Sequence, residues 1–194
     1  MLFSIGHSNH SIAHFVALLK QHGIALVADV RSSPFSRFNP QFNRETLQRT
    51  LSEHDMGYLF LGAELGARSS DPSCYDGARV SYEKLAATPM FQDGLRTLVA
   101  AAETHDVAMM CAEKEPLECH RTILIARELE RRSIAVIHIL EDGTAESHAS
   151  ALARLQTKLK LDADLFCDDV ERREQAYAAQ AQRIAYVRKI SAQP

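Results

Sequence analysis

Short apolar segments of strand length alternate with segments of helical periodicity over the first 140 residues, and this alternation limits the possible folds more than any other feature of the chain. The strand-like segments are residues 2–5, 26–30, 58–61, 107–111 and 134–140. Such alternation is typical of βαβ units, in which crossover helices join parallel strands. The sequence therefore predicts an α/β fold, with a Rossmann-like, open and mainly parallel sheet of about five strands flanked by helices.

The segments between these strands carry start and stop signals for helices. Ser11 is a favourable N-cap and Gly23 is typical of the position just past a helix end, so a first helix is expected between them. Pro116 suits the first turn of a helix that continues through Leu129. Other helices are expected after Arg44 and at residues 82–87 and 91–102.

The residues after Leu140 differ in character, because their pattern becomes helical and charged. A long final helix is expected over residues 168–190, with a broken apolar stripe along it. We therefore predict a core domain over residues 1–140 and a helical C-terminal extension over residues 141–194 that packs on the core. The stripe also allows a homodimer.

The composition is that of an ordinary globular protein, with 46% hydrophobic and 24% charged residues. A net charge of -3 argues against broad nonspecific binding to nucleic acid or to an anionic membrane. No apolar run approaches the ~20 residues of a membrane helix, and the first residues lack the charged region of a secretory signal. The four cysteines are too few and too scattered for a disulfide framework, so we expect reduced thiols, a cytoplasmic location and no membrane partner.

Polar side chains follow the predicted strands at their carboxyl ends. Ligands of open α/β sheets bind in the crevice beyond these ends, where the strand order reverses. With the strand order 3-2-1-4-5, the first and fourth strands are neighbours and their exits flank one crevice. The groups that would face it are His7, Ser8, Cys111 and Glu113.

Four short blocks stand out along residues 1–140. They are Ile5-Gly6-His7-Ser8, Asp29-Val30-Arg31-x-x-Pro34-x-Ser36-Arg37, Leu61-Gly62-x-x-Leu65-Gly66, and Cys111-x-Glu113 followed by Cys119-His120-Arg121. Their combination and order resemble the signature blocks of the family named domain of unknown function 488. The resemblance implies a small α/β protein with these positions at its site, and the family name itself records that the reaction is not settled.

Arg121 lies near the start of a predicted helix, where free N–H groups and the helix dipole already favour negative charge. A cation there makes sense if the partner is an anion, because the guanidinium offers a planar fork to phosphate or carboxylate oxygens. Arg31 and Arg37 could converge on the same anion. The alternative is that one of the nearby glutamates pairs with Arg121 inside the protein.

Several side chains in these blocks could react or carry a proton. A thiol near a helix N-terminus and a cation can become a thiolate nucleophile, which favours Cys119 over Cys111, although both could also be small buried apolar groups. Glu113 could be a general base, or a nucleophile toward a glycosidic carbon. His7 or His120 could carry a proton, and a structural hydrogen bond is an equal alternative for His7.

Cys111, Cys119 and His120 are also ligand types that zinc accepts. Their spacing contains no Cys-x-x-Cys or His-Glu-x-x-His pair, so a metal would need a remote partner such as His7 or Cys167. We therefore expect no metal and no cofactor. A redox-responsive protein with a labile disulfide between Cys111 and Cys119 is a further alternative.

The loop over residues 32–39 interleaves hydroxyl groups, a cation and aromatic rings, in the manner of surfaces that stack bases and bind phosphate. The alternative is that Phe35, Phe38 and Phe42 pack back on the core. The chain has no Gly-x-Gly-x-x-Gly and no Walker-type Gly-Lys-Ser or Gly-Lys-Thr, which argues against ordinary dinucleotide and P-loop chemistry.

These features together favour an enzyme, a hydrolase or group transferase, whose substrate is a small anionic ligand such as a nucleotide or a phosphate compound derived from nucleic acid. The alternatives are a noncatalytic module that binds a nucleotide or nucleic-acid fragment, and a thiol-based redox-responsive or metal-binding protein. The catalytic candidates are Glu113, Cys119, His7 and His120. The candidate substrate-binding residues are Ser8, Asp29, Arg31, Ser36, Arg37, Cys111 and Arg121.

Overall fold

Six strands form one sheet in the computed structural model, which describes residues 1–161 and 168–188. The strands are β1 (Leu2–Gly6), β2 (Leu26–Asp29), β3 (Gly57–Phe60), β6 (Val107–Cys111), β7 (Val136–Ile139) and β8 (Ala145–Ser147). Their order is β3-β2-β6-β1-β7-β8, and β8 runs antiparallel to β7 while the other neighbouring pairs are parallel. The predicted open and mainly parallel α/β sheet is confirmed.

The position of β6 corrects the expected strand order, because this fourth predicted strand lies between the second and the first. The order of the predicted strands is thus 3-2-4-1-5 instead of 3-2-1-4-5. Both β1 and β6 are buried along all five of their residues, as expected of central strands covered on both faces. Their apolar runs could therefore not tell which of the two lies next to β2. They are neighbours as expected, with Gly6 paired to Cys111 at their carboxyl ends.

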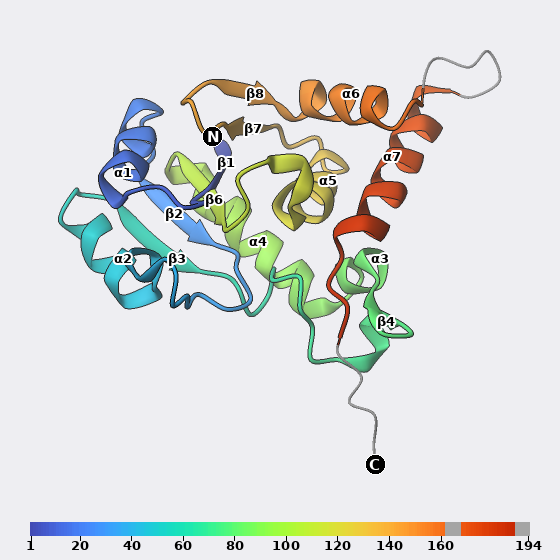
Figure 1. Cartoon of the computed structure of the whole chain (residues 1–194), viewed down its shortest axis with the longest axis horizontal. Coiled ribbons are helices and arrows are strands. Elements are labelled where there is room, and N and C mark those ends of the chain that lie inside the picture. The colour runs from blue at the N-terminus through green and yellow to red at the C-terminus, as the bar shows by residue number, and fades with distance from the viewer. Residues whose placement is uncertain (162–167, 189–194) are drawn as a thin grey trace.

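Helices cover both faces of the sheet (Figure 1). One face packs on α1 and α2 through a cluster that contains Phe15 and Leu47, and the other packs on α4 and the C-terminal helices through a cluster that contains Leu98 and Leu155. The helix bounds are α1 (Ile12–Gln21), α2 (Arg44–Ser52), α3 (Tyr82–Ala86), α4 (Pro89–Thr104), α5 (Arg127–Glu130), α6 (His148–Lys158) and α7 (Asp169–Ile184).

The signals at the ends of the first helix act as predicted. The Ser11 side chain accepts a hydrogen bond from the backbone N–H of His14, and Gly23 adopts a φ of 64° just past the helix end. Residues other than glycine rarely adopt that left-handed conformation, so the helix ends where the sequence indicated.

The segment after β6 does not form the single helix expected from Pro116. A separate 3-10 turn, η3 (Pro116–Glu118), comes first, and its N–H of Leu117 is capped by the Glu115 carboxylate. Cys119 is then extended, with φ −135° and ψ 144°, which breaks the helical path. A π-helical segment, η4 (Arg121–Ala126), follows and continues into α5. This break turns Cys119 and the next residue back toward the end of β6.

The long connection after β3 has local structure of its own. It contains the 3-10 turn η2 (Pro72–Cys74) and the hairpin of β4 (Tyr75–Asp76) and β5 (Arg79–Val80). A further 3-10 turn, η1 (Pro40–Phe42), precedes α2. The backbone N–H of Arg68 donates to Ser32 Oγ at 3.1 Å, so this connection lies against the exit of β2.

The C-terminal extension begins with β8, a strand that the sequence pattern did not indicate. The extension continues into α6 and α7, whose Leu152 and Tyr177 belong to the same buried cluster as α4. The helix α7 begins where the sequence indicated, with Asp168 as its N-cap, and ends at Ile184, after which Val187 bridges back to Arg79. The predicted continuation of the final helix to residue 190 is therefore wrong, because Ala185 is extended and the chain leaves the helix after Ile184. Cys167 lies outside the described residues.

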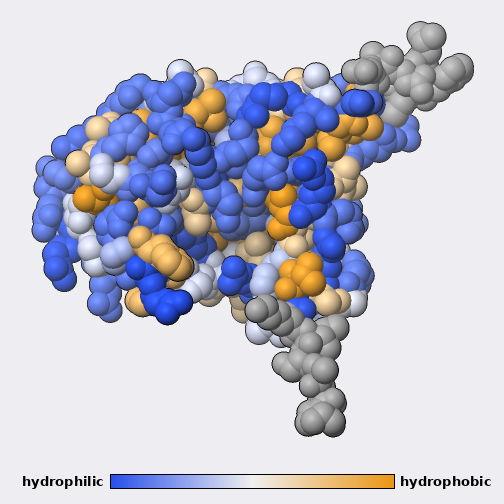
Figure 2. Space-filling view, viewed as in Figure 1, coloured by the Kyte–Doolittle hydropathy of each residue, from blue (hydrophilic) through white to orange (hydrophobic). Residues whose placement is uncertain are grey.

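The surface seen in Figure 2 is mostly hydrophilic, with hydrophobic side chains in small groups over the elements labelled in Figure 1. Among the described residues, no helix combines the length and the apolar character needed to cross a membrane.

Candidate functional site

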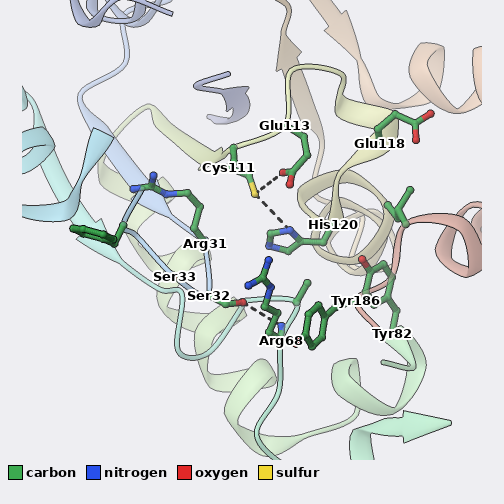
Figure 3. A pocket seen from close by; sticks show the side chains of 14 residues that line it. Arg31, Ser32, Ser33, Arg68, Tyr82, Cys111, Glu113, Glu118, His120 and Tyr186 are labelled. Atoms are coloured by element: carbon green, nitrogen blue, oxygen red, sulfur yellow. Dashed lines mark hydrogen bonds between the residues drawn. The ribbon is translucent and has the colours of Figure 1, made fainter. Parts of the chain in front are cut away.

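A cavity of ≈ 320 Å³ lies beyond the carboxyl ends of β2 and β6, where ligands of α/β sheets bind. The volume lies at the small end of the range for small-molecule sites, roughly 300–1,000 Å³. Four of the predicted site residues meet on its wall, and Figure 3 shows them around the cavity: Arg31, Cys111, Glu113 and His120.

Arg31 is held in a fixed orientation at the end of β2. Its Nε and Nη2 donate to the two carboxylate oxygens of Asp29 at 2.9 and 2.6 Å, and Nη2 also donates to the carbonyl of Phe42 at 2.8 Å. Tyr58 donates a further hydrogen bond to Asp29 at 2.7 Å. Burial works against the charge, but the bond to Asp29 raises the pKa of Arg31. Asp29 therefore keeps Arg31 charged and rigid behind the cavity wall.

His7 lies behind Arg31. Arg31 Nη1 lies 3.1 Å from His7 Nε2, and because a guanidinium can only donate, Nε2 accepts and Nδ1 carries the hydrogen. Nδ1 donates to the carbonyl of Ser8 at 2.8 Å, and the ring stacks on Phe42 with centroids 4.4 Å apart. Burial and the charge of Arg31 lower the pKa of His7 to about 4. His7 is thus a neutral imidazole that supports Arg31.

Arg68 is a cavity residue that the sequence did not indicate. Its guanidinium stacks over the ring of Tyr186 at 4.9 Å, and Figure 3 shows it extending toward His120. No carboxylate pairs with it among residues 1–161 and 168–188. An exposed guanidinium with free donors on a cavity wall is a ready binding group for an anion.

Two thiols, a carboxylate and an imidazole form a compact cluster on the opposite wall. The sulfurs of Cys111 and Cys119 each lie 2.9 Å from Glu113 Oε2, within hydrogen-bond distance. The Nδ1 atom of His120 lies 3.6 Å from the sulfur of Cys111 and 3.8 Å from that of Cys119. Its Nε2 lies 3.0 Å from the carbonyl oxygen of Val30, which can only accept, so Nε2 carries a hydrogen and Nδ1 faces the sulfurs.

The protonation of this cluster follows from burial and from Arg121. Burial raises the pKa of the Cys111 thiol, and the adjacent Cys119 raises it further. Burial works in the same direction at Cys119, but the hydrogen bond from Cys111 and the charge of Arg121 lower the pKa of Cys119 well below its ordinary value. Burial opposes the charge of His120, yet the thiolate of Cys119 raises its pKa. Partial burial of its carboxyl group also raises the pKa of Glu113, although the residue as a whole is exposed. The cluster can therefore both give and take a proton.

Arg121 anchors the loop that carries Glu113 from the protein interior, and its side chain is 0% exposed. Arg121 donates to the backbone carbonyls of Glu113 at 2.7 Å and Lys114 at 3.2 Å, and its Nε has no hydrogen-bond partner. Gly6 makes this arrangement possible, because a Cβ at that position would lie 1.9 Å from the Glu113 carbonyl oxygen.

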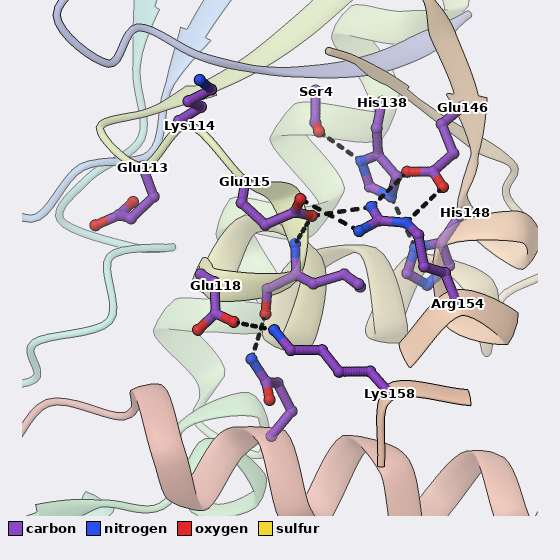
Figure 4. A network of polar contacts seen from close by, with 12 residues as sticks. Ser4, Glu113, Lys114, Glu115, Glu118, His138, Glu146, His148, Arg154 and Lys158 are labelled. Atoms are coloured by element: carbon purple, nitrogen blue, oxygen red, sulfur yellow. Dashed lines mark hydrogen bonds and ion pairs between the residues drawn. The ribbon is translucent and has the colours of Figure 1, made fainter. Parts of the chain in front are cut away.

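Ion pairs with α6 anchor the same loop from the outside (Figure 4). Arg154 pairs with Glu115 at 2.9 Å and with Glu146 at 2.9 Å, and Lys158 pairs with Glu118 at 2.7 Å. The C-terminal extension thus holds the loop between β6 and η4 in place.

The structure does not bring the three predicted arginines together. Arg121 is buried beneath the loop, and Arg37 is exposed outside the cavity wall, with its guanidinium 6.0 Å from the ring of Phe38. Ser36 shapes its own loop by accepting from the N–H groups of Phe38 and Asn39. Predicted residues that do not line the cavity are His7, Ser8, Asp29, Ser36, Arg37, Cys119 and Arg121.

The aromatic residues of the loop after β2 divide between the two alternatives. Phe42 is fully buried, whereas Phe35 and Phe38 are 68% and 86% exposed, and Phe35 lines the cavity. Tyr82 and Tyr186 complete the aromatic part of the wall. Tyr186 comes from the segment after α7, which shows why the sequence did not indicate it: nothing in its neighbours marks a return to the sheet edge.

Comparison with known proteins yields a family match. A family model described as Domain of unknown function DUF488 matches residues 11–129, more than half of the chain. No curated protein and no solved structure matches the chain significantly. The matched segment contains Arg31, Arg68 and the thiol-containing cluster, whereas His7 and Tyr186 lie outside it.

Proposed function

Since this chain belongs to the DUF488 family, whose description assigns no reaction, we infer its function from the site. We propose that it is a hydrolase or group transferase that acts on a small phosphate-bearing compound. One observation carries the proposal: a single cavity combines a free guanidinium with groups that can move a proton. Arg68 supplies the first, and Glu113 and His120 supply the second.

The anion would bind at Arg68, and the positive charge of Arg31 behind the same wall would add to the attraction. Arg68 has no carboxylate partner among the described residues, while Arg31 is oriented by Asp29 and still has donor capacity on Nη1. Phosphate oxygens take up such donors in bidentate pairs. The hydroxyl groups of Ser32 and Ser33 lie on the same wall and add neutral donors.

Aromatic groups on the wall favour a nucleotide or a fragment of nucleic acid as the substrate class. Phe35 and Tyr186 both line the cavity, and exposed rings of this kind stack on bases. A stacked base and a phosphate held by arginine use both kinds of group at once. The net charge of -3 fits recognition by this local pocket better than adsorption along a long polyanion.

Glu113 is the group best placed for proton transfer. Its carboxyl group projects to the cavity in Figure 3, and burial raises its pKa toward the range in which a carboxyl group works as an acid or a base. In hydrolysis it would take the proton of the attacking water and return it to the leaving oxygen. Cys111 would hold the carboxyl group in position and His120 would hold the Cys111 sulfur, while the cavity does not reach Cys119.

The test is a turnover screen of phosphate-bearing compounds, from inorganic pyrophosphate to nucleotides and dinucleotides, with four proteins. Wild type is compared with Arg68→Ala, Glu113→Gln and the control Arg49→Ala, whose arginine is exposed on α2 away from the cavity. We expect Arg68→Ala to raise KM and Glu113→Gln to lower kcat on the order of 100-fold or more, with the control unchanged. Equal turnover in all four proteins would refute the proposal. Saturable binding without product would favour the noncatalytic binding module instead.

The cysteines also support a cytoplasmic location. Cys74, Cys111 and Cys119 are free and buried. A site that uses Cys111 and Cys119 as free thiols beside one carboxylate would work in a reducing compartment. Equal maturation of the protein in a reducing and an oxidising compartment would count against this location.

A further inference from the structure

The thiol-containing cluster has the composition of a metal site. Cys111, Glu113, Cys119 and His120 each present one ligand atom, and these four atoms lie within 4.8 Å of one another. We propose that Zn²⁺ binds here, held by Sγ of Cys111, Sγ of Cys119 and Nδ1 of His120, with Glu113 on the fourth side toward the cavity. Thiolate and imidazole ligands suit zinc among the common divalent ions.

The spacing of the ligand atoms already approaches that of a tetrahedral site. Ligands about 2.0–2.3 Å from a tetrahedral Zn²⁺ lie about 3.3–3.8 Å from one another. His120 Nδ1 is 3.6 Å from one sulfur and 3.8 Å from the other. Glu113 Oε2, at 2.9 Å from both sulfurs, closes the group from the cavity side. The three proposed ligands therefore need little movement to hold an ion.

The imidazole is oriented as a metal ligand requires. His120 donates through Nε2 to the backbone carbonyl of Val30 at 3.0 Å, which leaves Nδ1 directed at the two sulfurs. A hydrogen bond from the second ring nitrogen to a carbonyl is the usual support of a metal-binding histidine. The carbonyl belongs to the residue after β2, so a rigid strand end fixes the ring.

Arg121 supplies an independent argument from charge. It is fully buried, donates to two backbone carbonyls and has no carboxylate partner among the described residues. A buried cation is costly unless anionic groups lie near it. Zn²⁺ with two thiolates and the carboxylate of Glu113 carries one net negative charge, which would complement Arg121. Such a cluster explains why a guanidinium is kept beneath this loop.

The fold also shows why the sequence spacing was uninformative. The expectation that a metal would need His7 or Cys167 as a remote partner is unnecessary, because the turn at η3 and the extended Cys119 bring four local residues together. The cluster lies between the end of β6 and the start of η4, two elements buried in the core. Zinc binding stands on the geometry of this cluster and on the buried charge of Arg121, and it does not depend on the proposed reaction.

The experiment uses the full chain, purified with a chelator and kept in a phosphine reductant. Co²⁺ is titrated first, because a tetrahedral thiolate site gives intense visible bands and a sulfur-to-cobalt charge-transfer band. Zn²⁺ is then added in competition, and the bound metal is counted by mass spectrometry. We expect one equivalent of Co²⁺ with the thiolate bands, replaced by one equivalent of Zn²⁺.

Variants assign the ligands. Cys111→Ser, Cys119→Ser and His120→Gln should each weaken Zn²⁺ binding by on the order of 100-fold or more, since loss of mere supporting contacts already costs 10- to 100-fold. Cys74→Ser is the matched control, because Cys74 is a free and buried thiol outside the cluster, and it should bind Zn²⁺ like wild type. Glu113→Gln should retain one Zn²⁺, held by the two sulfurs and the imidazole.

Two results would overturn the proposal, and both can be read from folded protein. The first is that reduced wild type binds no Co²⁺, or that its bound Co²⁺ gives a spectrum without thiolate bands. The second is full affinity in Cys119→Ser or His120→Gln, with circular dichroism confirming the fold. Because no substrate enters these assays, their outcome is separate from that of the turnover screen.

Discussion

Substitution of Gly6 by alanine tests the packing that places Glu113 at the cavity. The added Cβ would lie 1.9 Å from the carbonyl oxygen of Glu113 and 2.9 Å from its carbonyl carbon. An ordinary contact between carbon and a carbonyl oxygen is about 3.3 Å or longer, so the loop has to move by more than about 1 Å. This movement breaks the 2.7 Å hydrogen bond from Arg121 to the same carbonyl.

The cost can be estimated from these two effects. Overpacking costs about 1–3 kcal/mol, and loss of a hydrogen bond from a charged group costs about 1.5–3 kcal/mol. Gly6→Ala should therefore lower the free energy of unfolding by about 2.5–6 kcal/mol. The same movement draws Glu113 away from Cys111 and Cys119, so Zn²⁺ and substrate should both bind more weakly.

The assay is urea denaturation followed by circular dichroism, with Gly77→Ala as the control. Gly77 has a φ of 61° and open space around it, so its substitution reports backbone strain of about 1–2 kcal/mol without a clash. Comparable m values in the three proteins would show that the change is one of stability. If Gly6→Ala cost no more than Gly77→Ala, the close approach of β1 to the Glu113 loop would be refuted.

Three further perturbations address the substrate class, acid stability and the loop anchor. Phe35→Ala should weaken nucleotide binding by about 1–3 kcal/mol and leave inorganic pyrophosphate unaffected, as calorimetry can measure; equal losses for both would count against base stacking. Burial lowers the pKa of His138 well below its ordinary 6.5, so His138 takes up a proton in the unfolded chain at a higher pH than in the folded protein. At pH values below about 6.5, the free energy of unfolding should therefore decrease by up to about 1.4 kcal/mol for each pH unit. His138→Gln should flatten that slope in denaturation at several pH values, and an unchanged slope would contradict the assignment. Arg154→Ala removes half-exposed ion pairs to Glu115 and Glu146, so it should lower the free energy of unfolding by at most about 1 kcal/mol in the same assay. A loss of several kcal/mol would show that these pairs are not weak surface interactions.

Much of the fold could be read from the sequence because its signals are local. Ser11 and Gly23 end a helix through their own backbone and side-chain preferences, and the apolar runs at β1 and β6 mark buried strands. The order of those two strands is a global property. Both strands are buried along all their residues, so burial does not distinguish them.

The residues of the site likewise divide into those that local sequence signals indicate and those placed by packing between distant elements. Arg31, Glu113 and His120 directly follow strands or lie at a helix start, so their place at the sheet edge could be predicted. Arg68 and Tyr186 come from a long loop and from the C-terminal segment, and their approach depends on packing among distant elements. Arg121 differs for another reason, because the break at Cys119 turns its side chain beneath the loop instead of toward the cavity.

The central claim, that the cavity binds a phosphate-bearing anion, is tested most directly by locating tungstate, a heavy analogue of phosphate, in crystals of the full chain. The account predicts an anomalous peak inside the cavity within hydrogen-bond distance of the Arg68 guanidinium, and its loss in Arg68→Ala. A tungstate that binds elsewhere on wild type and leaves this cavity without an anion would contradict it.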